Sequence, residues 1–179
     1  NIAKRVTYNA KLRNSAICGA TETILIHEKV IKKFGNQILS NLEKGGCKII
    51  GDNKIKKFYK GKIQKATTKD WSKEYLSQIV SVKSVKNLDE SIMHINKFGT
   101  MHTDCIITEN KKSAKKFLDK VKSSIAMHNT STQFADGGEF GFGGEVGIST
   151  SKLPPRGPIG LNQLVSYKYQ ITSKGKIRK

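Results

Sequence analysis

The sequence predicts an α/β fold built on an open, mostly parallel sheet with helices on its faces. Short runs of β-branched and apolar residues alternate with longer segments whose apolar residues recur at helical spacing. This alternation is typical of βαβ units, which build parallel sheets. The 179 residues suffice for one domain with a proper core. No apolar run approaches the roughly 20 residues that span a bilayer.

The predicted elements follow one another in a regular order. Residues 1–11 form the end of a helix, and a buried strand at residues 23–27 follows the turn around Cys18. Residues 28–44 form an amphipathic helix that ends at two glycines. Its inward face is predicted to carry Val30, Ile31, Phe34, Ile38, Leu39 and Leu42.

The remaining elements repeat this alternation. Strands are predicted at residues 47–50, 79–85, 104–108 and 124–128, and helices at 52–59, 88–98 and 110–121, with a loop or edge strand at 61–69. Asn87 caps the helix at residues 88–98. The last helix is predicted to turn Ala114, Phe117, Leu118 and Val121 inward. Ligands of such sheets usually bind at the carboxyl ends of the strands.

The chain changes character after residue 128. Residues 129–150 contain six glycines but match neither the dinucleotide-binding G-x-G-x-x-G pattern nor a Walker loop. Three phenylalanines in this stretch predict a packed loop and not a linker. Residues 153–158 are a rigid proline-containing connection. Residues 164–172 alternate as a strand on a terminal arm, which would need another sheet to pair with, often that of a neighbouring subunit.

Charge and cysteine content narrow the class of protein. The net charge of +19 invites a nucleic-acid-binding reading, but only four of the 33 basic residues are arginine, the side chain that clamps phosphates best. The lysines are spread over nearly every exposed helix face. Three widely spaced cysteines fit a reducing cytoplasm. No spacing typical of a zinc site occurs, so no metal is expected.

Cys18 is the candidate nucleophile. It lies in the run SAICGAT at residues 15–21, whose small side chains leave room for a substrate to reach the sulfur. A thiol attacks as the thiolate, so its usual pKa of about 8.5 has to be lowered, and a place at a helix N-terminus would do this. The alternative is an inert buried cysteine, since no histidine lies nearby in the sequence to act as a base.

Four segments of the chain point to one family. They are NAKLRNSAICGATET, HINKFGTMHTDCIIT, NTSTQFADGGEFGFGGEVGIST and KLPPRGPIGLNQLVSYKY. Together they resemble the gamma-glutamyl phosphate reductases, also called glutamate-5-semialdehyde dehydrogenases, a branch of the aldehyde dehydrogenase superfamily. The resemblance covers essentially the whole chain, and the glycine-rich segment with its tail is specific to this branch.

The resemblance implies a catalytic domain at residues 1–150 with an aldehyde-dehydrogenase-like fold, and a C-terminal β arm for oligomerisation at residues 151–179. Members of the family also carry an N-terminal dinucleotide-binding domain, which we expect to be absent from this chain. The 179 residues alone are therefore expected to be inactive.

The resemblance also implies a cytoplasmic reaction of proline biosynthesis. NADPH reduces L-glutamyl 5-phosphate to L-glutamate 5-semialdehyde, and phosphate is released. Cys18 would form the thioester. The implied partners are this substrate, phosphate, further copies of the chain and, by functional coupling, glutamate 5-kinase; no nucleic acid or membrane is implied.

Further site residues are carried over from the resemblance. Glu74 matches the glutamate that holds the nicotinamide ribose of NADP, although it could be a solvated acid at a helix end. Asn129, Ser131 and Thr132, together with Thr130, match the loop that closes over the acyl chain, although simple turn chemistry would explain the same residues.

Two further groups are less closely defined. His102 is expected to form structural hydrogen bonds and not to act in catalysis. Either Glu139 or Glu145 could bind the substrate amine.

Two residues depart from the family pattern. Gly19 stands where the family usually has asparagine, which could loosen the turn that carries the thiol. Gln133 stands where the family usually has arginine, which puts in doubt a charged grip on a substrate carboxylate. Two other classes of function stay open: a lysine-rich nucleic-acid-binding module and a non-catalytic assembly domain.

Overall fold

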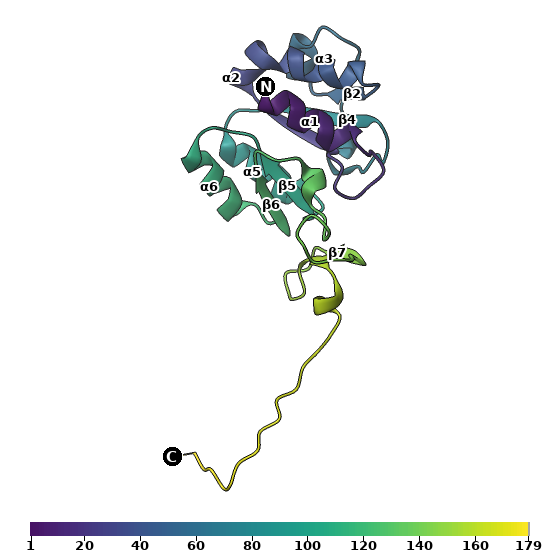
Figure 1. The fold of residues 1–179 in the computed structure, drawn as a ribbon. Helices are drawn as coiled ribbons and strands as arrows, with labels where there is room; N and C mark the ends of the chain where they lie inside the picture. Colours follow the sequence, from purple (N-terminus) through teal and green to yellow (C-terminus); the bar gives the residue numbers. More distant parts are fainter. Residues whose placement is uncertain (179) are drawn as a thin grey trace.

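The computed structural model describes residues 1–178, and the elements form three consecutive parts (Figure 1). The first part contains α1 (Ile2–Leu12), β1 (Thr23–His27), α2 (Glu28–Val30), α3 (Asn36–Lys44), β2 (Lys48–Gly51), α4 (Asn53–Phe58), β3 (Ile63–Lys65) and β4 (Ile79–Val85). The second contains α5 (Leu88–Phe98), β5 (Thr103–Ile106), α6 (Lys111–Lys120) and β6 (Ile125–His128). The third contains β7 (Gly147–Ser149), β8 (Gly157–Ile159) and an extended tail.

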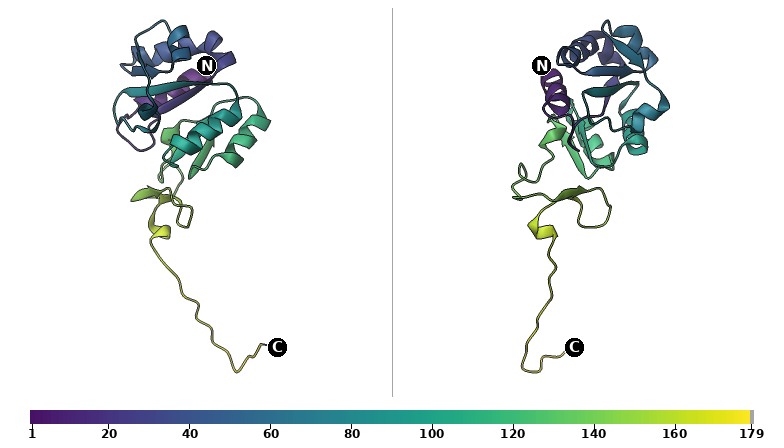
Figure 2. Two further views of the ribbon diagram at one scale, coloured as in Figure 1. Left: turned by 180° about the vertical axis from the view of Figure 1, so that it is seen from behind. Right: turned by 90° about the vertical axis from the view of Figure 1, so that its right-hand side faces the viewer.

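Parallel pairing dominates, as the sequence predicts. Four strands form one sheet in the order β1-β4-β2-β3, with Thr23 of β1 opposite Ser81 of β4. Strands β5 and β6 form a separate parallel pair, and β7 and β8 form an antiparallel hairpin. The strands therefore divide over two parallel sheets, and both views in Figure 2 keep the three parts in this order along the molecule.

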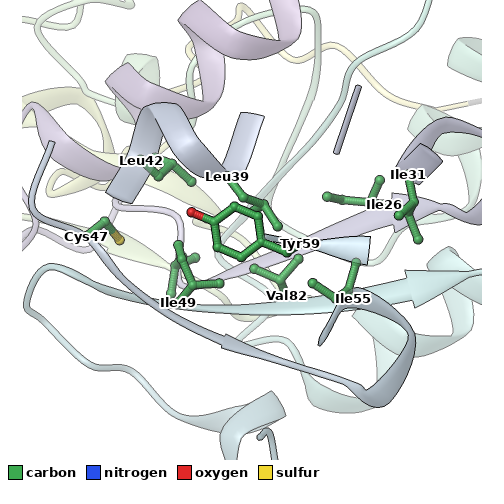
Figure 3. Packing of buried hydrophobic residues seen from close by; sticks show 10 residues of the cluster. Ile26, Ile31, Leu39, Leu42, Cys47, Ile49, Ile55, Tyr59 and Val82 are labelled. Carbon is green, nitrogen blue, oxygen red and sulfur yellow. The ribbon is translucent and has the colours of Figure 1, made fainter. Parts of the chain in front are cut away.

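The larger core lies between α3 and the four-stranded sheet (Figure 3). Leu39 and Leu42 of α3 pack with Ile49 of β2 and Val82 of β4, and all four side chains are fully buried. Cys47 lies in the same cluster and is buried. A smaller core holds α5 and α6 together through Ile92, Phe117 and Val121.

The predicted helix at residues 28–44 is interrupted by a π-helical segment, η1 (Ile31–Gly35). A π turn inserts one residue into the helical repeat and shifts the phase of the side chains. Ile38, Leu39 and Leu42 face the core as predicted. Val30 and Phe34 were predicted to do so too, but they are 37% and 44% exposed, so that part of the prediction is wrong.

Three other local predictions are wrong or incomplete. Leu118 is 39% exposed, because Ala114 and Phe117 already fill the contact of α6 with its sheet. Residues 164–172 were predicted to form a strand but form none, because within residues 1–178 they are paired with no sheet. The β7–β8 hairpin was not predicted, and it spans the expected boundary at residue 150.

Helix starts agree closely with the sequence. Asn87 Oδ1 accepts the Glu90 N–H at 2.9 Å and so caps α5, and Asn110 caps α6 in the same way. Across residues 1–178, the longest apolar helical stretches stay too short to cross a membrane.

Candidate active site

Cys18 lies in a turn between α1 and β1, and its thiol is exposed. The Ala20 N–H donates to the Ile17 carbonyl at 3.0 Å and closes the turn, and the Thr21 N–H donates to the Ala10 carbonyl of α1 at 2.9 Å. The thiol therefore follows the C-terminal end of α1 and does not lie at a helix N-terminus. Small residues around it do leave it accessible, as the sequence predicts.

The three cysteines differ sharply in their surroundings. Burial raises the pKa of Cys47 to about 11. Burial also raises the pKa of Cys105, which is half-buried in β5. Because the thiolate is the reactive form, these two side chains are poor nucleophiles near neutral pH. Among the three, Cys18 alone is exposed.

Cys18 opens into a groove of about 530 Å³ that runs between the first and second parts of the molecule. One wall is β1, from Thr23 to His27, and the other is formed by residues 99–108, which include β5. Glu74, Thr130 and Thr132 line the same groove. The structure thus brings three of the predicted site residues, Cys18, Glu74 and Thr132, to one cavity.

The groove only partly follows the usual rule that ligands of parallel sheets bind at the carboxyl ends of the strands. Cys18 precedes β1 and Glu74 precedes β4, so both approach the amino ends of their strands. The groove also includes residues at carboxyl ends of strands: His27 of β1, Asn87 after β4 and Thr108 after β5. The groove thus reaches the ends at which the sequence predicted ligands to bind, whereas the thiol itself lies at the amino end of its strand.

A buried ion pair links the segment of Glu74 to the thiol turn. Lys11 is fully buried, and its Nζ lies 2.7 Å from Glu22 Oε2. The other oxygen of Glu22 accepts the Leu76 N–H at 3.1 Å, and Leu76 has a positive φ of 48°. The pair holds α1, the start of β1 and the Glu74–Leu76 segment together. Sequence reasoning missed it, although Lys11 and Glu22 flank Cys18 closely.

Asn129 and Ser131 lie apart from the thiol groove. Both line a second cavity of about 670 Å³ beside α1, together with Arg5, Tyr8 and other residues of the helix. Asn129 uses both ends of its side-chain amide on the Thr108 backbone, at 2.9 Å each. This geometry fits the turn chemistry that the sequence left open for this residue.

Two histidines that line the groove, His94 and His102, are largely desolvated. His102 Nδ1 lies 2.7 Å from Thr103 Oγ1, whereas its Nε2 is buried and has no hydrogen-bond partner. Burial lowers the pKa of His102, and the carboxylates of Glu145 and Glu74 oppose that shift. His94, stacked near Trp71 and Phe98, has its pKa lowered to about 4 by burial. Both rings are thus neutral near pH 7.

The prediction that the phenylalanines make the glycine-rich loop a packed loop holds only in part, because Phe140 packs against a core cluster whereas Phe134 and Phe142 are 46% and 48% exposed. The ring centroids of Phe140 lie 6.3 Å from those of Phe134 and 5.9 Å from those of Phe142. Glu145 Oε2 accepts the Gly137 N–H at 2.6 Å, so that carboxylate already serves the loop itself. Glu139 is exposed to solvent. Within residues 1–178 no three acidic, histidine or cysteine side chains come together as metal ligands.

Gln133 points away from the cavities. It is buried, and its amide nitrogen donates to carbonyls at the end of α1, while its oxygen accepts from Arg13 at 3.4 Å. Gly19 packs against the same segment, because a Cβ at this position would lie 3.1 Å from the Thr132 carbonyl oxygen. The two departures from the family pattern are therefore neighbours in space.

Comparison with known protein families gives one match that covers most of the chain. The model of the aldehyde dehydrogenase family matches residues 3–152. A gamma-glutamyl phosphate reductase of Rhodospirillum rubrum is 47% identical over 176 residues, which are 98% of this chain and 41% of that protein. A protein of the same name from Clostridium beijerinckii is 45% identical over 177 residues, 99% of this chain and 42% of that protein.

Solved structures give the same picture. The crystal structure of gamma-glutamyl phosphate reductase from Thermotoga maritima superposes with a TM-score of 0.95 at 41% identity, over 99% of this chain and 43% of that chain. The yeast structure of the same name has a TM-score of 0.56 at 31% identity, over 78% of this chain and 35% of that one. The chain thus spans well under half the length of these relatives.

Proposed function

Because the chain belongs to the aldehyde dehydrogenase family, we propose that the protein carrying it is a gamma-glutamyl phosphate reductase that works through Cys18. Relatives of that name match nearly the whole chain at 45–47% identity. The observation that carries the proposal is the exposed thiol of Cys18, which shares one groove with Glu74 and Thr132. The reaction is the reduction of L-glutamyl 5-phosphate to L-glutamate 5-semialdehyde, a step of proline biosynthesis.

The chemistry suits a thiol without a neighbouring base. The Cys18 thiolate attacks the acyl carbon, the carbon–oxygen bond to phosphate breaks, and a thioester forms. Phosphate leaves readily, so no base has to assist its departure. Addition of a hydride to the thioester carbon gives a carbon that carries sulfur, hydrogen and an oxyanion, and this intermediate collapses to the aldehyde as the carbon–sulfur bond breaks. The thiolate is thereby regenerated.

Both steps pass through an oxyanion next to the sulfur, which needs hydrogen-bond donors at fixed positions. The backbone N–H of Cys18 is one donor from this chain. His102 lies in the groove wall, where its Nδ1 hydrogen-bonds with Thr103 Oγ1. We assign it a structural part in the groove wall.

NADPH, when bound, supplies the hydride for the second step. The residues present fit only its nicotinamide end: the exposed carboxylate of Glu74 shares the groove with the thiol and can accept hydrogen bonds from ribose hydroxyls. We propose that the groups that hold the rest of the dinucleotide belong to an N-terminal dinucleotide-binding domain of the complete protein, because this chain spans only 41–42% of the relatives' length. We therefore expect the 179-residue chain alone to be inactive.

We propose that residues of both cavities bind the substrate. Thr132 and Thr130 face the thiol groove, and we assign them to the acyl chain. Asn129 and Ser131 face the basic cavity that contains Lys4 and Arg5, and we assign them to the charged end of the glutamyl group. We further propose that residues 1–150 form the catalytic domain and residues 151–179 an oligomerisation arm, that the enzyme is cytoplasmic, and that it is coupled to glutamate 5-kinase.

Replacement of Cys18 by serine in the complete protein tests the function. We expect loss of the phosphate-dependent oxidation of glutamate semialdehyde, the reverse reaction, followed by NADPH absorbance. Cys47→Ala is the matched control, because Cys47 is buried in the core and should keep the activity once folded. Full activity in Cys18→Ser would remove the thiol from its role.

A further inference from the structure

The turn that carries Cys18 is held by a segment more than 110 residues away in sequence. That segment is the short 3-10 helix η3 (Thr132–Phe134), which begins just after Ser131. η3 contacts the start, the middle and the end of the Cys18 turn, and different residues make each of these contacts.

Gln133 holds the start of the turn. Its amide nitrogen lies 3.1 Å from the Asn9 carbonyl oxygen, 2.9 Å from that of Ala10 and 3.1 Å from that of Asn14. Two N–H groups thus serve three acceptors, one of them shared. Asn9 and Ala10 belong to the last turn of α1, where the Asn9 carbonyl also accepts the Arg13 N–H and the Ala10 carbonyl also accepts the Thr21 N–H, whereas Asn14 begins the thiol turn.

Thr132 holds the end of the turn, and Gly19 fills its middle. Thr132 Oγ1 lies 2.9 Å from Thr21 Oγ1. A Cβ at Gly19 would lie 3.1 Å from the Thr132 carbonyl oxygen and 3.4 Å from the Gln133 Cα. Glycine therefore allows the two backbones to touch next to the reactive sulfur.

We infer that Gln133 is a positioning residue that fixes the Cys18 turn by tying the end of α1 to the start of the turn. The inference rests on the proposed role of Cys18. Gln133 is only 6% exposed and points at backbone carbonyls, so it acts on the thiol through the turn and not on the substrate. A displaced nucleophile lowers the rate of attack steeply, while substrate contacts elsewhere are kept.

The nitrogen and the oxygen of the Gln133 amide have different partners, and this difference provides a matched control. Among residues 1–178, the amide oxygen accepts only from Arg13, an exposed residue, at 3.4 Å. Gln133→Leu keeps the approximate size but removes the donors, whereas Arg13→Leu removes only the contact at the oxygen. Gly19→Ala presses on the backbone of η3 from the other side and leaves the Gln133 side chain itself unchanged, so it serves if Gln133→Leu fails to fold.

Hydrogen exchange measures the order of the turn without any need for activity. In Gln133→Leu we expect the Ala20 and Thr21 amides to exchange roughly five- to tenfold faster, the factor for about one lost hydrogen bond, while β2 and β4 keep their protection. Gly19→Ala should act in the same direction, and Arg13→Leu should leave the exchange unchanged. Unchanged exchange in the first two variants would overturn the inference.

Kinetics in the complete protein separates positioning from mere stability. We expect Gln133→Leu to lower kcat by about 10- to 100-fold with KM for the acyl substrate nearly unchanged. A raised KM with normal kcat would instead make Gln133 a binding residue, and normal kinetics despite faster exchange would make it purely structural; either result overturns the inference. Failure of the proposed function would appear separately, as retained activity in Cys18→Ser.

Discussion

The exposure of a thiol decides what chemistry it can carry out. Cys18 is exposed, whereas burial raises the pKa of both Cys47 and Cys105. We predict that iodoacetamide at pH 7.5 modifies Cys18 at least about tenfold faster than the other two, because alkylation follows thiolate content and access. Peptide mass spectrometry of a time course measures all three rates in one sample. Equal rates would mean that the turn closes over the sulfur in solution.

Asp104 is the residue whose ionisation opposes folding most clearly. Desolvation raises its pKa to about 6, although Ser123 donates a hydrogen bond to it. Because the pKa rises on folding, the folded state holds the proton more tightly than the unfolded chain does. The unfavourable contribution is therefore complete above pH 6 and vanishes below the ordinary aspartate pKa of about 4.

We predict that Asp104→Asn stabilises the chain at neutral pH. The amide oxygen can still accept from Ser123, while the buried charge is removed. The free energy of unfolding should rise by on the order of 2 kcal/mol near pH 7.5, with no gain near pH 4. Urea unfolding at the two pH values measures the difference. Asp119→Asn is the control, because that side chain is exposed.

Among the elements, α1 is linked to the four-stranded sheet by an ion pair whose lysine is fully buried. Lys11 is fully buried and paired with Glu22 at 2.7 Å, and Glu22 also holds the Leu76 N–H. We predict that Lys11→Met lowers the free energy of unfolding by about 3 kcal/mol, because Glu22 is left as an uncompensated charge. Chemical denaturation of the two proteins measures the loss.

The double variant Lys11→Met/Glu22→Gln separates charge from packing. It should recover part of the lost stability, since no unpaired charge remains. Lys115→Met is the surface control, because its ion pair with Asp119 is exposed and should contribute little. A double variant as unstable as Lys11→Met would show that packing and not charge is at stake.

Local sequence signals predicted most elements well, because their causes are local. The strand at residues 23–27 and the helix at 88–98 have the predicted bounds, the latter through the Asn87 cap and the periodicity of its apolar residues. The π segment at residues 31–35 was missed, since a phase shift inside a helix depends on how its two halves pack and not on composition. Phe34 is exposed for this reason.

The site was predictable only as far as single residues carry signals. Cys18 stood out by its small neighbours and by family resemblance. Glu74 and the loop at residues 129–132 stood out by family resemblance alone. The partners that hold them did not: Lys11 with Glu22, and Gln133 with the end of α1, meet only through the tertiary fold. Such contacts leave no periodic pattern in one sequence.

At the level of the whole molecule, the thiol groove lies between two strand edges. β1 is the outer strand of the four-stranded sheet, and β5 faces it across the groove. Within residues 1–178 these edges carry no further strand, so their backbone N–H and C=O groups border the cavity. An open edge accepts another strand readily.

The C-terminal tail, like these strand edges, has no further strand paired with it within residues 1–178. Beyond η4 (Leu161–Gln163), Val165, Tyr167, Tyr169 and Ile171 alternate with more polar residues, and their exposed fractions are 66%, 83%, 83% and 90%. An alternating strand with one apolar face is stable only when it pairs with a sheet and buries that face. Figure 1 shows the tail extending away from both parallel sheets of its own chain. We therefore propose that it pairs with another copy.

Deletion of residues 161–179 from the complete protein should reduce the oligomer to smaller species while leaving the core intact. Light scattering coupled to size-exclusion chromatography measures the mass, and thermal unfolding checks the core. Tyr167→Lys with Tyr169→Lys should have the same effect, because charge on the apolar face prevents its burial. Lys168→Ala, on the opposite face of an extended chain, should keep the native mass. An unchanged mass in both the deletion and the tyrosine variant would mean that assembly depends on other surfaces.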